Sequence, residues 1–290
     1  MTAYSGYGFG KLILCGEHAV VYGEPAIAFA VQRGTQATLT AYDGPTCIDE
    51  GDVHPDLLAA VHDVCGPHGW RVALKTELPI GRGMGSSAAL AVALARAHAT
   101  ATGGSTHRDD LYKAALPVEQ RFHGNPSGID LACAMDGGGR WFVRGTPPTV
   151  ASIRMPRHTF VVMDTGLAGD TSMQVGKVAR DHPDNAHILR AIGETVRACR
   201  EALGEVSSLG PLLNENHRLL SELGVSTPEL DTLVAHALAH GACGAKLAGA
   251  GGGGVAFALC DGPEGGAQVL DAMHTLGARA WLCEPQGATS

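Results

Sequence analysis

The stretch Pro79-Ile80-Gly81-Arg82-Gly83-Met84-Gly85-Ser86-Ser87-Ala88 is the most informative part of this sequence. It follows a predicted strand, 72–76, and precedes an alanine-rich run without Gly or Pro, 88–102, which predicts a helix with Ser86 and Ser87 at its N-cap. Glycines let the backbone approach a bound group without Cβ clashes, and the free N–H groups at a helix N-terminus attract an anion. The stretch therefore predicts a phosphate-binding loop, with an ordinary strand-to-helix turn as the alternative.

Two other phosphate-binding loops do not fit this stretch. A Walker A loop ends in Gly-Lys-Ser or Gly-Lys-Thr, and no Lys follows Gly85. A Rossmann loop has the spacing Gly-x-Gly-x-x-Gly, whereas here the third glycine comes one residue early. Both interpretations are therefore rejected.

The stretch resembles instead the phosphate-binding motif of the GHMP kinases, Pro-x-x-x-Gly-Leu-Gly-Ser-Ser-Ala, with Met84 in place of Leu. Members of this family transfer the γ-phosphate of ATP to a small alcohol. The resemblance implies that the phosphates of ATP are bound by Gly81, Gly83, Met84, Gly85, Ser86, Ser87 and Ala88.

A second motif lies near the N-terminus. The segment 10–23 reads Gly-Lys-Leu-Ile-Leu-Cys-Gly-Glu-His-Ala-Val-Val-Tyr-Gly and resembles the N-terminal signature of the mevalonate kinases within that family. Taken alone, Lys11 would be interpreted as a solvated charge at a strand edge. Glu17 and His18 are harder to explain in that way, because the flanking apolar runs would leave them next to a core. The resemblance implies that Lys11 is catalytic and that Glu17 and His18 bind the substrate.

The segment 123–130, His-Gly-Asn-Pro-Ser-Gly-Ile-Asp, is the third motif. Its Gly and Pro residues end the preceding predicted helix, so that Ser127 and Asp130 are expected to begin a new element. Asp is common in the first turn of a helix, which would make Asp130 an ordinary helix charge. The octapeptide resembles that of the mevalonate kinases, which implies that Asp130 is catalytic and orients or deprotonates the attacking hydroxyl.

By the same resemblance, a Mg²⁺ ion is bound by Glu119, eleven residues before Asp130, together with Ser87. Carboxylate and hydroxyl oxygens suit this hard cation. Pro117 departs from the family pattern and is expected to kink or interrupt the helix predicted over 106–123.

Two more motifs lie in the second half. The segment 246–254 reads Lys-Leu-Ala-Gly-Ala-Gly-Gly-Gly-Gly and resembles another family motif, with a flexible hairpin as the alternative; the resemblance implies that Gly249 and Ala250 contact the substrate. The segment 164–171 resembles a further one, which implies that Thr171 contacts the acceptor. Many relatives carry a basic residue where this chain has Asp170.

The bulk composition limits the partners. Over 290 residues the net charge is −8, which argues against a nucleic-acid partner. No apolar run reaches the length that spans a bilayer, and no signal peptide is recognisable, so we expect a cytoplasmic protein without a membrane partner. The eight cysteines form no C-x-x-C pair and are expected to be buried free thiols, and the histidines show no zinc-binding spacing.

Apolar runs with strand patterns are mixed with helix patterns, which predicts an α+β protein. Besides those already given, strands are expected at 12–15, 26–31, 35–41, 141–143, 159–163 and 255–259, and helices over 185–223, divided near Gly210-Pro211, and over 227–240. The resemblance implies the two-domain GHMP kinase fold, with a ribosomal-S5-like N-terminal domain (1–153) and a ferredoxin-like C-terminal domain (154–290).

Together, the motifs imply a kinase that uses ATP and Mg²⁺ to convert mevalonate to 5-phosphomevalonate, in isoprenoid precursor synthesis. Two alternatives stay open. One is a GHMP kinase acting on another small alcohol, such as phosphomevalonate, homoserine or a sugar. The other is a non-catalytic member that binds a nucleotide or metabolite. A homodimer is compatible with the sequence.

Overall fold

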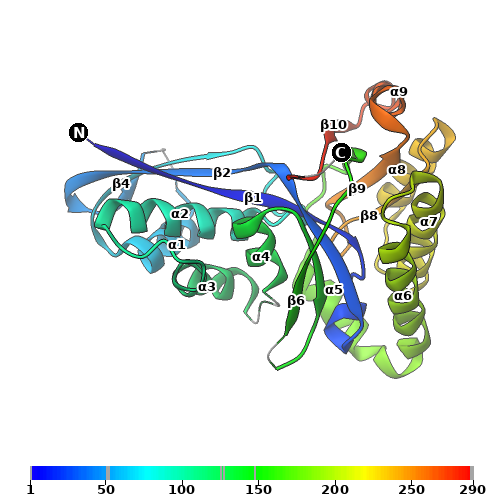
Figure 1. Ribbon diagram of the computed structural model, residues 1–290, viewed down its shortest axis with the longest axis horizontal. Helices are drawn as coiled ribbons and strands as arrows, with labels where there is room; N and C mark the ends of the chain where they lie inside the picture. The colour runs from blue at the N-terminus through cyan, green and yellow to red at the C-terminus, as the bar shows by residue number, and fades with distance from the viewer. Residues whose placement is uncertain (1, 50–52, 125, 127, 147, 288–290) are drawn as a thin grey trace. The chain divides into compact units, whose positions relative to one another are not determined.

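The computed structural model describes residues 2–49, 53–124, 126, 128–146 and 148–287 (Figure 1). The chain forms two compact units, and neither is continuous in sequence. Unit 1 consists of Met1–Lys11, Arg33–Pro79 and Gly85–Gly137, and unit 2 of Leu12–Gln32, Ile80–Met84 and Gly138–Ser290. Strands β1 (Ala3–Cys15) and β2 (Pro25–Pro45) are long enough to run from one unit into the other.

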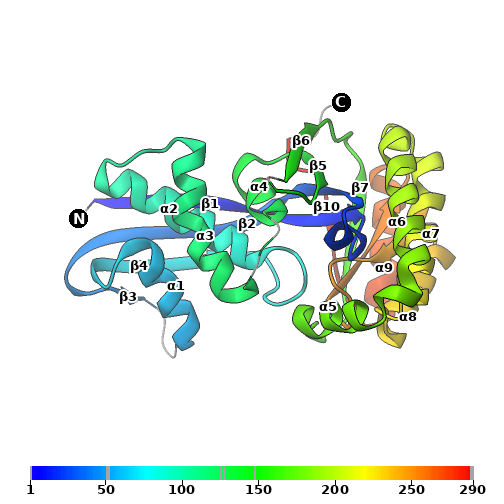
Figure 2. The same cartoon turned by 90° about the horizontal axis from the view of Figure 1, so that it is seen from below.

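Unit 1 is a sheet covered by helices. The end of β2 pairs antiparallel with β4 (His68–Thr76), and β3 (Cys47–Ile48) pairs parallel with β4. Figures 1 and 2 show the helices of this unit gathered on one face of its sheet. These helices are α1 (Pro55–Cys65), α2 (Ser86–Thr102), α3 (Arg108–His123) and α4 (Ile129–Asp136).

Small side chains bring α2 close to β1. Most of the alanines of α2 are buried, so this helix packs closely on its neighbours. On β1, a Cβ added at Gly6 would lie 2.2 Å from the Ala93 carbonyl oxygen, and one at Gly8 would lie 2.1 Å from that of Ala89. Glycine is therefore required where the strand crosses the helix, and this packing positions the start of α2 in unit 1.

Unit 2 contains a four-stranded antiparallel sheet in the order β10-β7-β9-β8. Along the chain these elements come as strand, helices, two strands, helix and strand, which is the β-α-β-β-α-β pattern of a ferredoxin-like domain. The beginning of β2 pairs with β5, and β5 with β6. The strands of unit 2 are β5 (Gly139–Val143), β6 (Thr149–Ile153), β7 (Thr159–Asp164), β8 (Gly244–Leu247), β9 (Val255–Cys260) and β10 (Arg279–Cys283).

Helices α7, α8 and α9 contact the strands of this sheet, and α6 packs along α7 (Figure 2). A single 3₁₀ turn, η1 (Ala19–Tyr22), links β1 to β2. The helices of unit 2 are α5 (Thr171–Arg180), α6 (His182–Ala202), α7 (Val206–Glu222), α8 (Pro228–Ala239) and α9 (Gly262–Thr275).

The predicted α+β class is confirmed, but several boundaries were wrong. The strands expected at 26–31 and 35–41 are one strand, because Gly34 does not turn the chain: a Cβ there would lie 2.1 Å from the Gly8 carbonyl oxygen of β1. Likewise, the break in 185–223 falls at 203–205 and not at Gly210. Gly210 lies inside α7, where a Cβ would lie 2.3 Å from the Cys243 carbonyl oxygen. Both glycines serve close packing rather than a turn.

Two smaller predictions also differ from the structure. Helix α3 continues through Pro117, which does not interrupt it. Two of the eight free cysteines, Cys47 and Cys243, are partly exposed rather than buried, because they lie on the short strand β3 and just before β8. Ser127 lies outside the described residues. Within the described part of the chain, no helix combines the length and apolar character needed to cross a membrane.

Candidate active site

Two predicted catalytic residues meet inside unit 1. Lys11 lies on β1 and Asp130 in the first turn of α4, and Lys11 Nζ is 3.3 Å from Asp130 Oδ1. The Lys11 side chain is 6% exposed, whereas that of Asp130 is 25% exposed. The carboxylate can therefore meet a substrate while its ammonium partner is held in the protein. A paired carboxylate and ammonium can accept a proton and stabilise negative charge at one place.

The predicted metal ligands lie beside this pair. Glu119, on α3, is buried, and its Oε1 atom has no hydrogen-bond partner among the described residues. Ser87, at the start of α2, interacts with the Glu119 carboxylate through its hydroxyl, and its Oγ lies 3.0 Å from Nε2 of His123. A buried carboxylate oxygen without a partner is costly unless something binds it. The donor set therefore fits a hard cation such as Mg²⁺.

Burial, together with the nearby Asp130 carboxylate, raises the pKa of Glu119 to about 7, although the Ser87 hydroxyl and Lys11 oppose the rise. Burial also lowers the pKa of His123; the Asp130 carboxylate opposes this effect and Lys11 adds to it. Near neutral pH, His123 is therefore uncharged beside a carboxylate that is only partly ionised. Such perturbed groups, gathered at one place, are typical of functional sites.

The predicted phosphate loop has the backbone that its glycines permit. Gly81, Gly83 and Gly85 have φ values of 70°, 83° and 70°, in the left-handed region that other residues avoid. Ser86 and Ser87 are the first residues of α2 rather than side-chain caps, so the predicted serine N-cap was wrong: the N-cap is Gly85, whose carbonyl accepts the first helical hydrogen bond. The N–H groups of residues 86–88 thus precede the helix ladder and are free for an anion.

The side chains along the loop differ in burial. Met84 is 1% exposed and anchors the loop, and Ala88 is fully buried in α2. A Cβ at Gly85 would lie 2.9 Å from Cγ of Lys11, so this glycine makes room for the lysine side chain inside unit 1. Gly85 and the predicted catalytic residue Lys11 are therefore adjacent.

In unit 2, Glu17 forms an ion pair with Lys246, and both side chains are almost fully buried. His18 follows Glu17 and adopts φ 60° and ψ −50°, with the Ala19 N–H bonded to the Glu17 carbonyl at 2.6 Å. This combination is the rare and strained γ-turn. Non-glycine residues keep such a conformation only where the surrounding structure enforces it, and they cluster at functional sites.

The imidazole of His18 contacts the second glycine-rich motif. Its Nε2 donates to the Ala250 carbonyl at 2.8 Å, because a carbonyl oxygen can only accept. Burial lowers the pKa of His18, an effect that the bond to Ala250 opposes. The neutral ring therefore presents Nδ1 as an acceptor, which suits a substrate hydroxyl better than a carboxylate.

The remaining predicted substrate residues also belong to unit 2. A Cβ at Gly249 would lie 3.3 Å from Cα of Gly83, so the backbones of the two glycine-rich loops touch. Thr171 is exposed at the first position of α5. The unexpected Asp170 has a local explanation: its Oδ1 accepts a hydrogen bond from the Met173 N–H at 2.9 Å and caps α5.

Three side chains were not predicted to act in the site. Lys246 is the partner of Glu17, His123 contacts Ser87, and Arg82 connects the phosphate loop to the 164–166 turn. All three lie within motifs that the sequence had already marked. Their partners lie 36 to 229 residues away in the sequence, so no local sequence pattern identifies these contacts.

The chain matches known proteins over most of its length. Residues 56–138 match the family model of the GHMP kinases N-terminal domain, and residues 196–279 match that of the GHMP kinases C-terminal domain. A protein of Thermococcus sibiricus named "Mevalonate kinase" is 32% identical, over 92% of this chain and 91% of that relative. A "Mevalonate kinase" of Pyrococcus horikoshii is 33% identical, over 88% of each.

Solved structures agree with this result. The crystal structure of L. major mevalonate kinase in complex with R-mevalonate has a TM-score of 0.87 and 26% sequence identity, covering 98% of this chain and 97% of that one. The two family models, and relatives above 30% identity along nearly the whole sequence, lead to one conclusion. This chain belongs to the GHMP kinase family.

Proposed function

We propose that this chain transfers the γ-phosphate of ATP to the C5 hydroxyl of mevalonate, giving ADP and 5-phosphomevalonate. The observation that carries the proposal is the 3.3 Å contact between Lys11 and Asp130, two motif residues from distant parts of the sequence. The names of the relatives, which match over about nine tenths of their own length, support mevalonate as the acceptor.

Phosphoryl transfer depends mainly on the positioning of the reactants and on neutralisation of the charge on the phosphates. Different residues of this chain would supply these two effects. Asp130 orients the hydroxyl and accepts its proton as the oxygen attacks the γ-phosphorus atom, while the bond to ADP breaks. Lys11 stabilises the negative charge of the transferring group. The phosphates of ATP contact the loop glycines and the N–H groups of Ser86, Ser87 and Ala88 at the start of α2.

Mg²⁺ would be held by Glu119 and Ser87, whose oxygens include the unpartnered Oε1 of Glu119. When bound there, the ion would neutralise charge on the phosphates. Within the described residues no group of three or more His, Cys, Asp or Glu side chains is placed to bind a metal. Two protein oxygens agree with the habit of Mg²⁺ of keeping waters and substrate phosphates as its other ligands.

Unit 2 would supply the substrate contacts. His18 accepts from a hydroxyl of mevalonate, Gly249 and Ala250 line the substrate through their backbones, and Thr171 contacts its far end. Glu17 acts by fixing the segment that holds His18. We also propose a domain boundary at 153/154, a cytoplasmic location and a homodimer.

A coupled assay of ADP release over a panel of alcohols tests the proposal. We expect turnover with mevalonate and little with phosphomevalonate, homoserine or galactose. Turnover with one of the others alone would keep the kinase and exclude mevalonate. ATP binding without turnover on any alcohol would favour the non-catalytic alternative.

A further inference from the structure

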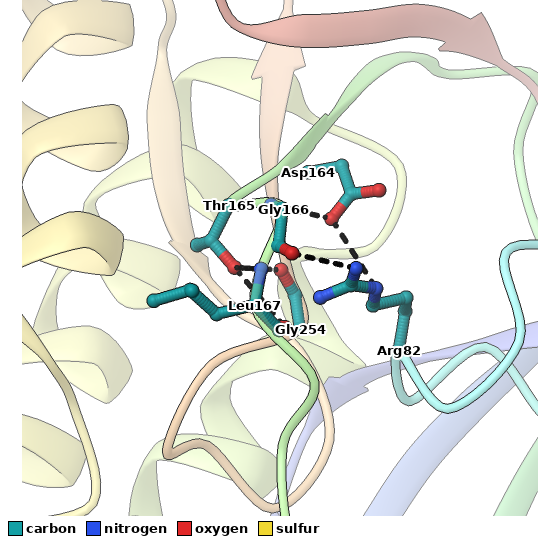
Figure 3. A network of polar contacts seen from close by, with 6 residues as sticks. All are labelled: Arg82, Asp164, Thr165, Gly166, Leu167 and Gly254. Atoms are coloured by element: carbon teal, nitrogen blue, oxygen red, sulfur yellow. Dashed lines mark hydrogen bonds and ion pairs between the residues drawn. The ribbon is translucent and has the colours of Figure 1, made fainter.

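The side chain of Arg82 connects the phosphate loop to a turn far along the chain. Its Nη2 atom donates to the Gly166 carbonyl at 2.7 Å, and its Nε atom lies 3.7 Å from Oδ1 of Asp164. Figure 3 shows the guanidinium directed at both acceptors. The side chains of Arg82 and Asp164 are 19% and 4% exposed, so water weakens this contact less than it weakens a surface ion pair.

The acceptor turn is itself well ordered. Oδ1 of Asp164 also accepts from the Gly166 N–H at 2.9 Å, which fixes the carbonyl that Arg82 contacts. Thr165 Oγ1 donates to the Gly254 carbonyl at 2.8 Å, and the Gly254 N–H donates to the Leu167 carbonyl at 2.8 Å (Figure 3). The turn is thereby joined to the second glycine-rich loop and offers Arg82 a fixed anchor.

The part of the loop before Arg82 has few contacts of its own. Ile80 is 76% exposed, and a Cβ added at Gly81 would meet nothing within 4 Å. Glycine loses more conformational freedom on ordering than any other residue. Buried Met84 anchors the end of this loop. Between Gly81 and Gly83, the side chain of Arg82 adds a polar contact to the 164–166 turn, which restricts the part of the loop that the two glycines leave free to move.

We propose that Arg82 is a positioning residue, which holds residues 80–84 in their phosphate-binding conformation through Asp164 and the Gly166 carbonyl. The inference rests on the proposed function, in which this loop binds the phosphates of ATP. Without the tie, a smaller fraction of the molecules has the competent loop, and the apparent affinity for nucleotide falls by that fraction.

The test is calorimetric binding of a non-hydrolysable ATP analogue with Mg²⁺, without any acceptor alcohol. We expect Arg82→Ala to raise the Kd about tenfold, which corresponds to about 1.4 kcal/mol. Asp164→Asn keeps the shape of the turn and removes its charge, and we expect a rise of about threefold. The double variant should bind no more weakly than Arg82→Ala, because both changes break one tie.

Two further variants separate this role from general damage. Arg82→Lys keeps the charge but lacks the planar guanidinium group, whose separate N–H donors reach both acceptors. Its Kd should therefore lie between those of the parent and Arg82→Ala. Arg157 forms a comparable pair with Glu284 in the same unit, at 3.2 Å and far more exposed, and Arg157→Ala should bind like the parent. Thermal unfolding of each variant checks its fold.

Equal Kd values for the parent and Arg82→Ala would overturn the inference, and so would effects of Arg82→Ala and Asp164→Asn that multiply in the double variant. If Arg82→Ala does not fold, Arg82→Lys and Asp164→Asn decide in the same way: parent-like binding by both would overturn it. A parent that binds the analogue but phosphorylates no alcohol would contradict the proposed function and leave this inference standing. A parent that binds no ATP analogue would overturn both.

Discussion

Lys246 and Glu17 form an ion pair inside unit 2, with side chains 0% and 1% exposed, although 229 residues separate them in the sequence. The ammonium group also donates to the Leu247 carbonyl at 2.6 Å and lies 5.2 Å from the centre of the Phe257 ring. The pair therefore joins the segment that carries His18 to the start of the second glycine-rich motif.

Loss of one partner from this pair should strongly destabilise the protein. We expect Lys246→Met to lower the free energy of unfolding by about 3–5 kcal/mol, because the Glu17 carboxylate is left buried without its countercharge. Adding Glu17→Gln should restore much of this loss. Urea denaturation measures both, and a single variant within 1 kcal/mol of the parent would show that the pair contributes little.

Asp130→Asn should abolish most of the turnover and leave the fold intact. Asn has the same shape but cannot accept the hydroxyl proton, so we expect kcat to fall about 10²- to 10⁴-fold. Binding of an ATP analogue should change little. Asp136→Asn, at the exposed end of the same helix and paired with Arg108, is the matched control. Near-normal turnover by purified Asp130→Asn would remove this residue from the mechanism.

Ser87→Ala and Glu119→Gln should both require more Mg²⁺ for activity. Each removes one of the two protein oxygens proposed for the ion, so the Mg²⁺ concentration at half-maximal rate should rise about tenfold. A Mg²⁺ titration at saturating ATP measures it, with Ser152→Ala on the exposed strand β6 as control. If Glu119→Gln reaches half its maximal rate at the same Mg²⁺ concentration as the parent, another residue holds the metal.

The raised pKa of Glu119 predicts how stability depends on pH in metal-free protein. This carboxyl ionises near 4.5 in the unfolded chain and near 7 in the folded one, so the folded state binds more protons between these values. The free energy of unfolding therefore falls as the pH rises from 4.5 through 7. Above pH 7 the ionised group destabilises the protein by up to about 3 kcal/mol.

Glu119→Gln removes this titration. With EDTA present, the variant should be more stable than the parent at pH 8, and the difference should vanish near pH 4. Denaturation at both pH values measures the change. A difference independent of pH would show that the folded carboxyl titrates normally.

His18→Gly should weaken the binding of mevalonate selectively. Glycine removes the imidazole yet accepts the φ of 60° at this position, so the backbone strain is relieved. We expect the KM for mevalonate to rise at least tenfold and that for ATP to change less than threefold. His18→Ala should show the same kinetics as His18→Gly. It should unfold at a lower temperature than His18→Gly, because alanine must keep the strained turn. An equal rise in both KM values would indicate general damage.

The sequence by itself determined the features that depend on local chemistry. The alanine-rich run after the loop is a helix, as predicted, and the glycines at 81, 83 and 85 adopt positive φ values, which glycine permits. Lys11 and Asp130 could be chosen in advance only because they lie in recognisable motifs. Hydrophobic patterns predict helices and strands, and short motifs identify residues whose chemistry suits a particular function.

Only the tertiary structure decided what each residue meets. The sequence predicted two strands divided between residues 31 and 35 and two helices divided near Gly210, yet Gly34 and Gly210 permit close contact with β1 and with the residue before β8. Arg82 lies between two glycines in the sequence, and only the fold brings it to its acceptors in the turn at 164–166. The physical reason is that packing clearance, burial and charge pairing depend on groups brought together from distant parts of the chain, and a linear sequence does not record these distances.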